Sequence, residues 1–233
     1  MRPIACRASL TAALVAAAFA GGIVIAQPES PAREAQAIAD LPTGRLARPA
    51  SYAELTAEQR DYVRGILAGP RANIPPPLAA MMASPRLGDL VQRGVAYARF
   101  AGTEEGTSVP PKLNELAILM AARMWSGEYV WHAHQDYAVR VGLPADVAEA
   151  VRTGRDPLGM EPDVDAVYRL LDELITTRAV SDATLDAARE VLGGDRGVVD
   201  LVGTFGLYSI SSMLVTLDRA PLPGGVAPYF GER

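Results

Sequence analysis

The chain has 233 residues, of which 49% are hydrophobic, and its 22 basic and 27 acidic side chains give a formal net charge of −5. A mildly acidic chain of this length can bury one full core. It lacks the basic balance that binding to nucleic-acid phosphates requires, so we expect no nucleic-acid partner.

The first 26 residues have the pattern of a secretory signal peptide. Arg2 and Arg7 give a positive start, an apolar stretch follows over residues 10–25, and small residues precede a cleavage point after Ala26. The alternative is a retained membrane anchor, but 16 apolar residues are fewer than the roughly 20 that a stable span needs. The sequence therefore predicts a periplasmic or secreted protein with no stable membrane span after cleavage.

Cleavage would also remove Cys6, the only cysteine. The mature chain would then have no thiol, so it could form no disulfide and use no cysteine as a nucleophile or metal ligand. Residues 27–50 are rich in proline, alanine and charge without sustained periodicity, and we interpret them as a flexible leader. The remaining residues, 51–233, are predicted to form a single all-α domain.

The first half of this domain contains two expected helices. Thr56 and Gln59 have the spacing of a capping box, and an apolar stripe follows it as far as Gly69. A proline-rich connection leads to a short turn over residues 78–83. After Pro85, apolar residues recur at helical spacing up to Gly102. The expected inner positions of these two helices are Tyr62, Val63, Ile66 and Leu67, and Leu87, Leu90, Val91, Gly94, Val95 and Ala98.

The second half has a similar pattern. Pro111 suits the first position of a helix, whose inner face is expected to comprise Leu113, Leu116, Ala117, Met120, Ala121 and Met124. Ser126 and Gly127 interrupt it, and the next helix is expected to end near Val141. Further helices are expected over 144–153, 163–178 and 181–192. The last, over about 197–217, is apolar on nearly every face, which favours the middle of a bundle or a subunit interface. Strand signals are weak, so the predicted fold is an all-α antiparallel helical bundle.

The mature chain would have two histidines, His132 and His134. Histidine is well suited to proton transfer near neutral pH. Residues two apart on a helix point about 200° apart, so the two rings should not act together. The apolar positions Val130, Ala133, Tyr137 and Val141 suggest the core face. His134 lies beside that face and is the favoured reacting group, whereas His132 lies with Glu128 and Gln135. For either histidine, a purely structural role remains an alternative.

Glu115 is the candidate partner of His134. It lies near the start of the preceding helix, at a distance from the turn that permits contact with His134 without requiring it. A carboxylate beside an imidazole fixes its tautomer, as general acid–base chemistry requires. The alternative is a carboxylate that interacts only with the helix dipole.

Other chemistries have little support in the sequence. A His-x-His pair on a helix cannot present both rings to one metal ion, and His-Glu-x-x-His is absent, so we expect neither a metal nor another cofactor. No nucleotide-binding glycine motif and no Gly-x-Ser-x-Gly elbow occurs. Lys112, the only lysine, is expected to be a solvated surface charge rather than a Schiff-base former.

Three segments resemble a known family. The runs PPKLNELAILMAARM (110–124), GEYVWHAH (127–134) and AVRVGL (138–143) are similar to the core of carboxymuconolactone decarboxylases and alkylhydroperoxidase D-like proteins. VSDATL (180–185) and the apolar helix after it resemble the longer, decarboxylase-like branch. The resemblance covers about residues 78–221. The two cysteines of the peroxidase branch fall on Gly127 and Val130, which excludes peroxide reduction by a dithiol.

The resemblance implies an activity and an assembly. The family forms trimers or hexamers of antiparallel helices with sites near subunit contacts, and its reaction is cofactor-independent loss of a carboxyl group from a lactone. By this resemblance the chain is a lyase, acting on a small carboxylated, aromatic-derived or lactone compound. An elimination or isomerisation and a non-catalytic oligomer that binds a small molecule remain alternatives. The implied catalytic residues are His134, Glu115 and Tyr129, and Trp131 is an implied substrate contact. Arg123 is a candidate anion clamp for a substrate carboxylate, with a surface or subunit-contact role as the alternative. His132 is not part of the family pattern; it is a further candidate substrate contact, and its role stays open.

Overall fold

The computed structural model describes residues 31–69, 71–99 and 106–231, so the proposed signal peptide lies outside the described residues. Within these ranges the chain forms ten α-helices and two short 3-10 turns, with no strand, which confirms an all-α fold. The α-helices are α1 (Pro31–Ala39), α2 (Ala57–Ala68), α3 (Pro76–Ala80), α4 (Pro85–Arg99), α5 (Pro111–Met124), α6 (Glu128–Arg140), α7 (Ala145–Thr153), α8 (Pro162–Thr176), α9 (Asp182–Leu192) and α10 (Asp195–Asp218).

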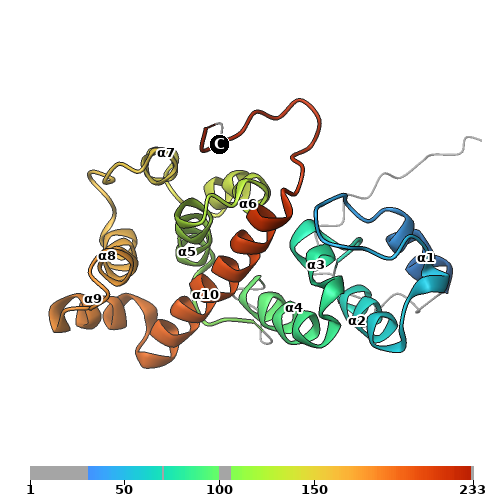
Figure 1. Ribbon diagram of the computed structural model, residues 1–233. Coiled ribbons are helices and arrows are strands. Elements are labelled where there is room, and N and C mark those ends of the chain that lie inside the picture. Colours follow the sequence, from blue (N-terminus) through green and yellow to red (C-terminus); the bar gives the residue numbers. More distant parts are fainter. Residues whose placement is uncertain (1–30, 70, 100–105, 232–233) are drawn as a thin grey trace, which may run out of the picture.

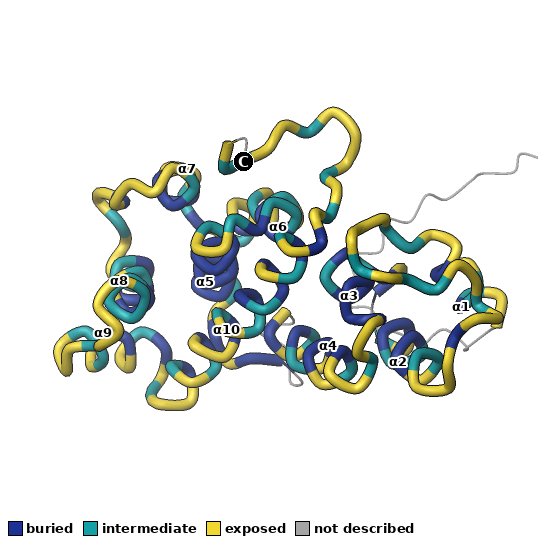
Figure 2. The backbone as a smooth tube through the Cα atoms, in the orientation of Figure 1, coloured by how far each residue is buried: buried dark blue, intermediate teal, exposed yellow. Residues whose placement is uncertain are grey.

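Helices α5 and α6 form the centre of the fold. Ten of the fourteen residues of α5 are buried, more than in any neighbouring helix (Figure 2). Pro111 occupies the first turn, as expected, and Ser126, at φ 48°, reverses the chain between the two helices. Lys112 at the start of α5 lies against Gly142 just beyond α6, so the two helices run antiparallel. This places the residues of the predicted site on facing helices.

Helix α10 connects the two sides of the molecule. Figure 1 shows it crossing from α8 and α9 toward α3 and α4, and it packs against α3, α4, α5, α6 and α9. Gly127, at the start of α6, lies where a side chain would come within 2.6 Å of the Ser212 Cβ on α10. Glycine therefore permits the close approach of α6 to α10. The last helix packs against five others, while its expected place in the middle of a bundle or in a subunit interface stays a prediction.

The flexible leader expected over residues 27–50 is wrong for its described part. Helix α1 buries Glu34, which accepts hydrogen bonds from the Tyr52 hydroxyl and the Arg64 guanidinium. Farther along, Arg48 pairs with the buried carboxylate of Asp218 at the end of α10. The composition of this segment is loop-like, but ionic contacts to distant parts of the chain hold it against the domain.

The expected inner face of α4 also needs correction. Val91, Val95 and Ala98 are buried, whereas Leu87 and Leu90 are 54% and 63% exposed. The helix is turned so that Gly88 faces Tyr62, where a Cβ would lie 2.7 Å from the ring. Because this glycine lies in the inner stripe, the two leucines point outward. On α5, Met124 is likewise 40% exposed instead of buried.

Candidate active site

His134 and Glu115 form a buried pair at the centre of the molecule. His134 is 6% exposed and Glu115 is 1% exposed. The Nδ1 atom of His134 lies 2.8 Å from Glu115 Oε2. Because an ionised carboxylate only accepts hydrogen bonds, we assign the proton to Nδ1, which donates to Glu115. The other ring nitrogen, Nε2, is then left for proton exchange with a ligand. Glu115 and His134 are thus in contact, which their spacing in the sequence permitted but did not require.

The buried stripe of α6 differs from the expected one. Val130 and His134 are buried, but Trp131 and Ala138 complete the stripe in place of Ala133 and Tyr137. Tyr137 is 40% exposed and lies under the Arg140 guanidinium. The α6 helix is rotated toward α5, which places His134 between α5 and α10. His134 is therefore the buried histidine, as predicted. Two of the positions used for that prediction, Ala133 and Tyr137, are nevertheless exposed.

His134 lines a cavity of about 320 Å³, which we call the acid–base cavity. Its walls come from the α2–α3 connection, α3, α4, α6 and α10. His134, Ala133 and Arg99 also line an adjacent hollow of about 280 Å³ with Tyr137 and Arg140, and we interpret this side as the mouth of the cavity. The residues that line the acid–base cavity are Arg71, Ala72, Asn73, Pro75, Pro77, Leu78, Val95, Arg99, Tyr129, Val130, Ala133, His134, Tyr208 and Ser211.

Two tyrosines, Tyr129 and Tyr208, line this cavity. Burial raises the pKa of Tyr129, and the nearby Arg99 charge opposes this only in part. Burial and the Glu115 carboxylate together raise the pKa of Tyr208, whose ring meets the His134 ring edge-to-face at 4.9 Å. Both phenols therefore stay protonated at neutral pH and can donate hydrogen bonds to a ligand oxygen. The sequence predicted Tyr129 but not Tyr208, because Tyr208 is 74 residues beyond His134 on an otherwise apolar helix.

Arg71 and Arg99 are cavity residues that the sequence did not single out. Arg71 is 7% exposed, and its Nη2 atom has no hydrogen-bond partner among the described residues. Arg99, the last residue of α4, lines both the cavity and its mouth. No local pattern marks either residue, since Arg71 lies in a short proline-flanked connection and Arg99 at a helix end. Only the tertiary structure brings them to His134.

Arg123, the predicted anion clamp, lies elsewhere. Its guanidinium is stacked over the Phe230 ring, 5.4 Å from the centroid, and approaches Gly154 at the end of α7. It is absent from the walls of the acid–base cavity. Arg123 lies eight residues after Glu115, about two helical turns away, and the rotation of α5 directs it toward the C-terminal segment. Its predicted role in substrate binding is not supported by this position.

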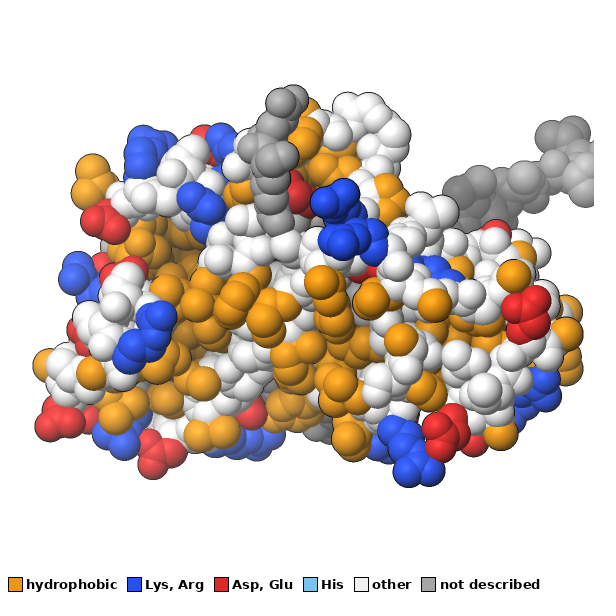
Figure 3. Space-filling view, in the orientation of Figure 1, with side chains coloured by type: hydrophobic (Ala, Val, Ile, Leu, Met, Phe, Trp, Pro, Cys, Tyr) orange, Lys and Arg blue, Asp and Glu red, His pale blue; other side chains and the backbone are white. Residues whose placement is uncertain are grey.

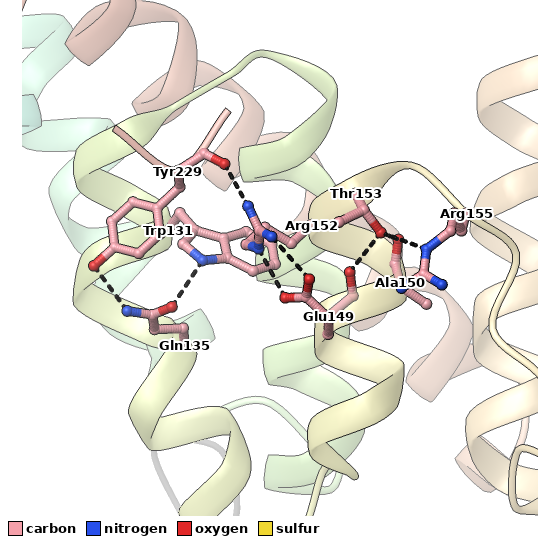
Figure 4. Close-up of polar contacts among 8 residues, drawn as sticks. All are labelled: Trp131, Gln135, Glu149, Ala150, Arg152, Thr153, Arg155 and Tyr229. Atoms are coloured by element: carbon pink, nitrogen blue, oxygen red, sulfur yellow. Dashed lines mark hydrogen bonds and ion pairs between the residues drawn. The ribbon is translucent and has the colours of Figure 1, made fainter. Parts of the chain in front are cut away.

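Trp131 and His132 also lie outside the cavity walls. Trp131 is buried against Phe230, and its indole N–H donates to Gln135. Figure 4 shows Gln135 reaching from there to the Tyr229 hydroxyl. The same hydroxyl lies 2.8 Å from His132 Nδ1. Both residues therefore hold the C-terminal segment across α6, and neither is placed to touch a ligand beside His134.

The C-terminal segment has further contacts with α6 and α7. The carboxylate of Glu128 accepts hydrogen bonds from the backbone N–H groups of Tyr229 and Phe230. Arg152 on α7 donates to the Tyr229 carbonyl, as drawn in Figure 4. His132, a candidate for chemistry in the sequence, therefore acts with Glu128 and Arg152 to hold the C-terminal segment in place.

Other expected residues have ordinary structural roles. Lys112 pairs with Glu161 and Asp163, so it is a paired charge at the edge of α5 and α8. Over the described part of the chain, no group of three or more His, Cys, Asp or Glu side chains is arranged to hold a metal ion. No known protein-family model and no curated protein matches the chain significantly.

Proposed function

We propose that the chain is a cofactor-independent lyase of the decarboxylase type, acting by general acid–base proton transfer on a small carboxylated, aromatic-derived or lactone compound. The observation that carries this proposal is the buried His134–Glu115 pair, of which His134 lines a cavity of small-molecule size. General acid–base groups must lie within hydrogen-bond reach of the ligand. In support, His134 lines the cavity, and its Nε2 is not engaged by Glu115.

The proposed roles follow from the positions of the side chains. Glu115 orients the imidazole through Nδ1 and stabilises the imidazolium when His134 carries a second proton. The Tyr129 and Tyr208 hydroxyls donate hydrogen bonds to the conjugated carbonyl oxygen, where negative charge collects as the carbon–carbon bond breaks and CO₂ leaves. His134 then returns a proton to the carbon that lost the carboxylate, and it is reprotonated from solvent. The cavity mouth at Arg99 admits that solvent.

The proposal is tested with purified protein and a panel of small lactone and aromatic-derived carboxylates. CO₂ release is measured, and NMR of the product in D₂O detects deuterium at the carbon that receives the proton. We expect His134→Ala to lower turnover by at least about 10²-fold. His132→Ala is the matched control, since that histidine contacts the C-terminal segment instead of the cavity. Undiminished turnover in His134→Ala would exclude the proposed acid.

A non-catalytic oligomer that binds a small molecule is the second candidate. Arg71 lines the cavity, and its Nη2 atom has no hydrogen-bond partner among the described residues, which favours ligand binding whether or not a reaction follows. On this reading, no compound in the panel is converted, while some of them bind and protect the fold against heat.

We further propose that the mature chain is periplasmic or secreted and assembles into a homo-trimer or homo-hexamer. The signal-like pattern of residues 1–26 supports export. Large exposed apolar residues on α4 and α10, such as Leu90 and Val199, support assembly, and Figure 3 shows hydrophobic side chains in a band across the face where α10 lies. N-terminal sequencing of the exported protein and light scattering after gel filtration test the two statements. An uncut N-terminus or a monomer would contradict them.

A further inference from the structure

Arg71 is a buried cation without a counter-ion in the part of the chain that the structure describes. It is 7% exposed, its Nη2 is fully enclosed and unpaired, and no carboxylate lies within ion-pair distance of it. An uncompensated charge in a protein interior is strongly unfavourable. Such a group calls for an anionic partner that the described residues do not supply, and Arg71 lines the acid–base cavity, where a ligand would lie.

The backbone around Arg71 is held by the N-terminal part of the chain. Arg33 on α1 donates a hydrogen bond to the Arg71 carbonyl at 3.1 Å. Residue 71 precedes the family-like segment, which begins near residue 78. The N-terminal segment, whose composition resembles a loose leader, therefore helps to position the backbone that carries this cation. Helix α1 thereby has a role in the site as well as in packing.

The charges around the cavity have one sign. Arg71 and Arg99 line the cavity, and Arg99 and Arg140 line its mouth. None of the described residues that line either space is acidic. Glu115 is near the cavity but does not line it, and its carboxylate is hydrogen-bonded to His134 Nδ1. A narrow space with cations and low-dielectric walls concentrates anions. Tyr208 lines the same cavity, and its ring meets the His134 ring edge-to-face at 4.9 Å.

We propose that Arg71 is the anion-binding residue of the acid–base cavity and that its ligand is a small organic carboxylate, held with its remaining carbon skeleton toward His134. The planar guanidinium fork matches a carboxylate through two parallel hydrogen bonds. Arg99 at the mouth attracts the same anion from solvent. The identification of this carboxylate as part of a substrate rests on the proposed function, whereas the binding of the anion does not.

The test uses calorimetry with sodium benzoate as the probe, benzamide as its neutral counterpart and inorganic phosphate as a second anion. We expect benzoate to bind at least about tenfold more tightly than benzamide, as a charge-assisted hydrogen bond implies. Arg71→Met should weaken benzoate by at least about tenfold and raise the Tm, because it removes an unpaired buried charge. Arg71→Lys, which keeps the charge but not the fork, should fold and bind benzoate less tightly than the native chain does.

The matched control is Arg123→Met, since Arg123 also has a buried unpaired Nε but lies outside the cavity. It should leave benzoate affinity unchanged. Equal binding of benzoate and benzamide, or unchanged benzoate affinity in Arg71→Met, would overturn the anion site. Tighter binding of phosphate than of benzoate would overturn the choice of a carboxylate. His134→Ala should still bind benzoate. Benzoate binding by a native chain that converts no compound of the panel would reject the lyase and keep the anion site.

Discussion

The carboxylate of Glu115 lies 2.8 Å from the Nδ1 atom of His134, although 19 positions separate the two residues in sequence and both are buried. The pair connects α5 to α6 across the centre of the bundle. It also sets which nitrogen of the imidazole faces the acid–base cavity. The consequences of this contact and of three others can be measured.

Glu115 is expected to act as a positioning residue. Glu115→Gln keeps the side-chain volume but removes the charge that holds the proton on Nδ1, so the imidazole can adopt either tautomer. We expect turnover to fall by about 10²-fold or more. In NMR spectra of ¹⁵N-labelled protein, the Nδ1–H signal of His134 should broaden or disappear. The matched control is Glu34→Gln, which alters a buried carboxylate that pairs with Arg64 far from His134. An unchanged tautomer in Glu115→Gln would remove this role.

Gly127→Ala should destabilise the protein. The new methyl group would meet the Ser212 Cβ at 2.6 Å and its Cα at 2.9 Å, and backbone atoms cannot move aside easily. Overpacking of this kind costs about 1–3 kcal/mol, measured by denaturant unfolding. Gly203→Ala on α10 is the control, because its Cβ would meet nothing within 4 Å. There, replacing a helical glycine should stabilise the fold by about 0.5–1 kcal/mol. Equal effects at the two sites would contradict the close approach of α6 and α10.

Asp218 should make stability depend on acid. Burial alone would raise its pKa, but the hydrogen bonds from Arg48 and from the Leu46 backbone N–H outweigh this and lower it below the ordinary 3.8. A depressed carboxyl pKa contributes stability that is present above about pH 4 and is lost as the pH falls through the folded-state pKa.

The variant for this test is Asp218→Asn, which leaves Arg48 without its partner. Breaking a buried pair costs about 3–5 kcal/mol at pH 7. The free energy of unfolding of the variant, followed by denaturant titration from pH 7 to pH 2, should fall less steeply below pH 4 than that of the native chain. Parallel curves for the two proteins would show that this carboxylate does not contribute to the acid dependence.

The Tyr229 hydroxyl should anchor the C-terminal segment. It contacts His132 Nδ1 and accepts a hydrogen bond from Gln135, each at 2.8 Å. Tyr229→Phe removes both bonds and should cost about 1–2 kcal/mol. It should also hasten proteolytic cleavage within residues 219–231. Tyr168→Phe, which removes one exposed contact to Asp156, is the control and should change little. Unchanged cleavage in Tyr229→Phe would show that the backbone contacts with Glu128 suffice.

Local patterns in the sequence were enough to locate most helices. The capping box at Thr56 and Gln59 forms as predicted, and Pro111 begins α5. The expected helices over 144–153 and 181–192 match α7 and α9 within one residue at each end. These features depend on residues only three or four positions apart, whose interactions are the same in a helix whatever surrounds it.

The local sequence pattern did not determine how each helix is rotated about its own axis. Leu87 and Leu90 are apolar and at the right spacing, yet they are exposed because Gly88 admits Tyr62 on the other side. Ala133 and Tyr137 were expected in the core, but α6 buries Trp131 and Ala138 instead. An amphipathic pattern with several small residues allows more than one rotation, and the neighbouring helices select among them.

The sequence by itself determined which side chains are available for chemistry near His134: the imidazole itself, a carboxylate on the preceding helix, and no cysteine anywhere in residues 27–233. The tertiary structure decided which charges surround that imidazole. In the folded chain, Arg123, Trp131 and His132 contact the C-terminal segment, whereas Arg71, from the α2–α3 connection, lines the cavity. The physical reason is that helical spacing fixes neighbours within one or two turns, whereas contacts between distant segments depend on how whole helices pack.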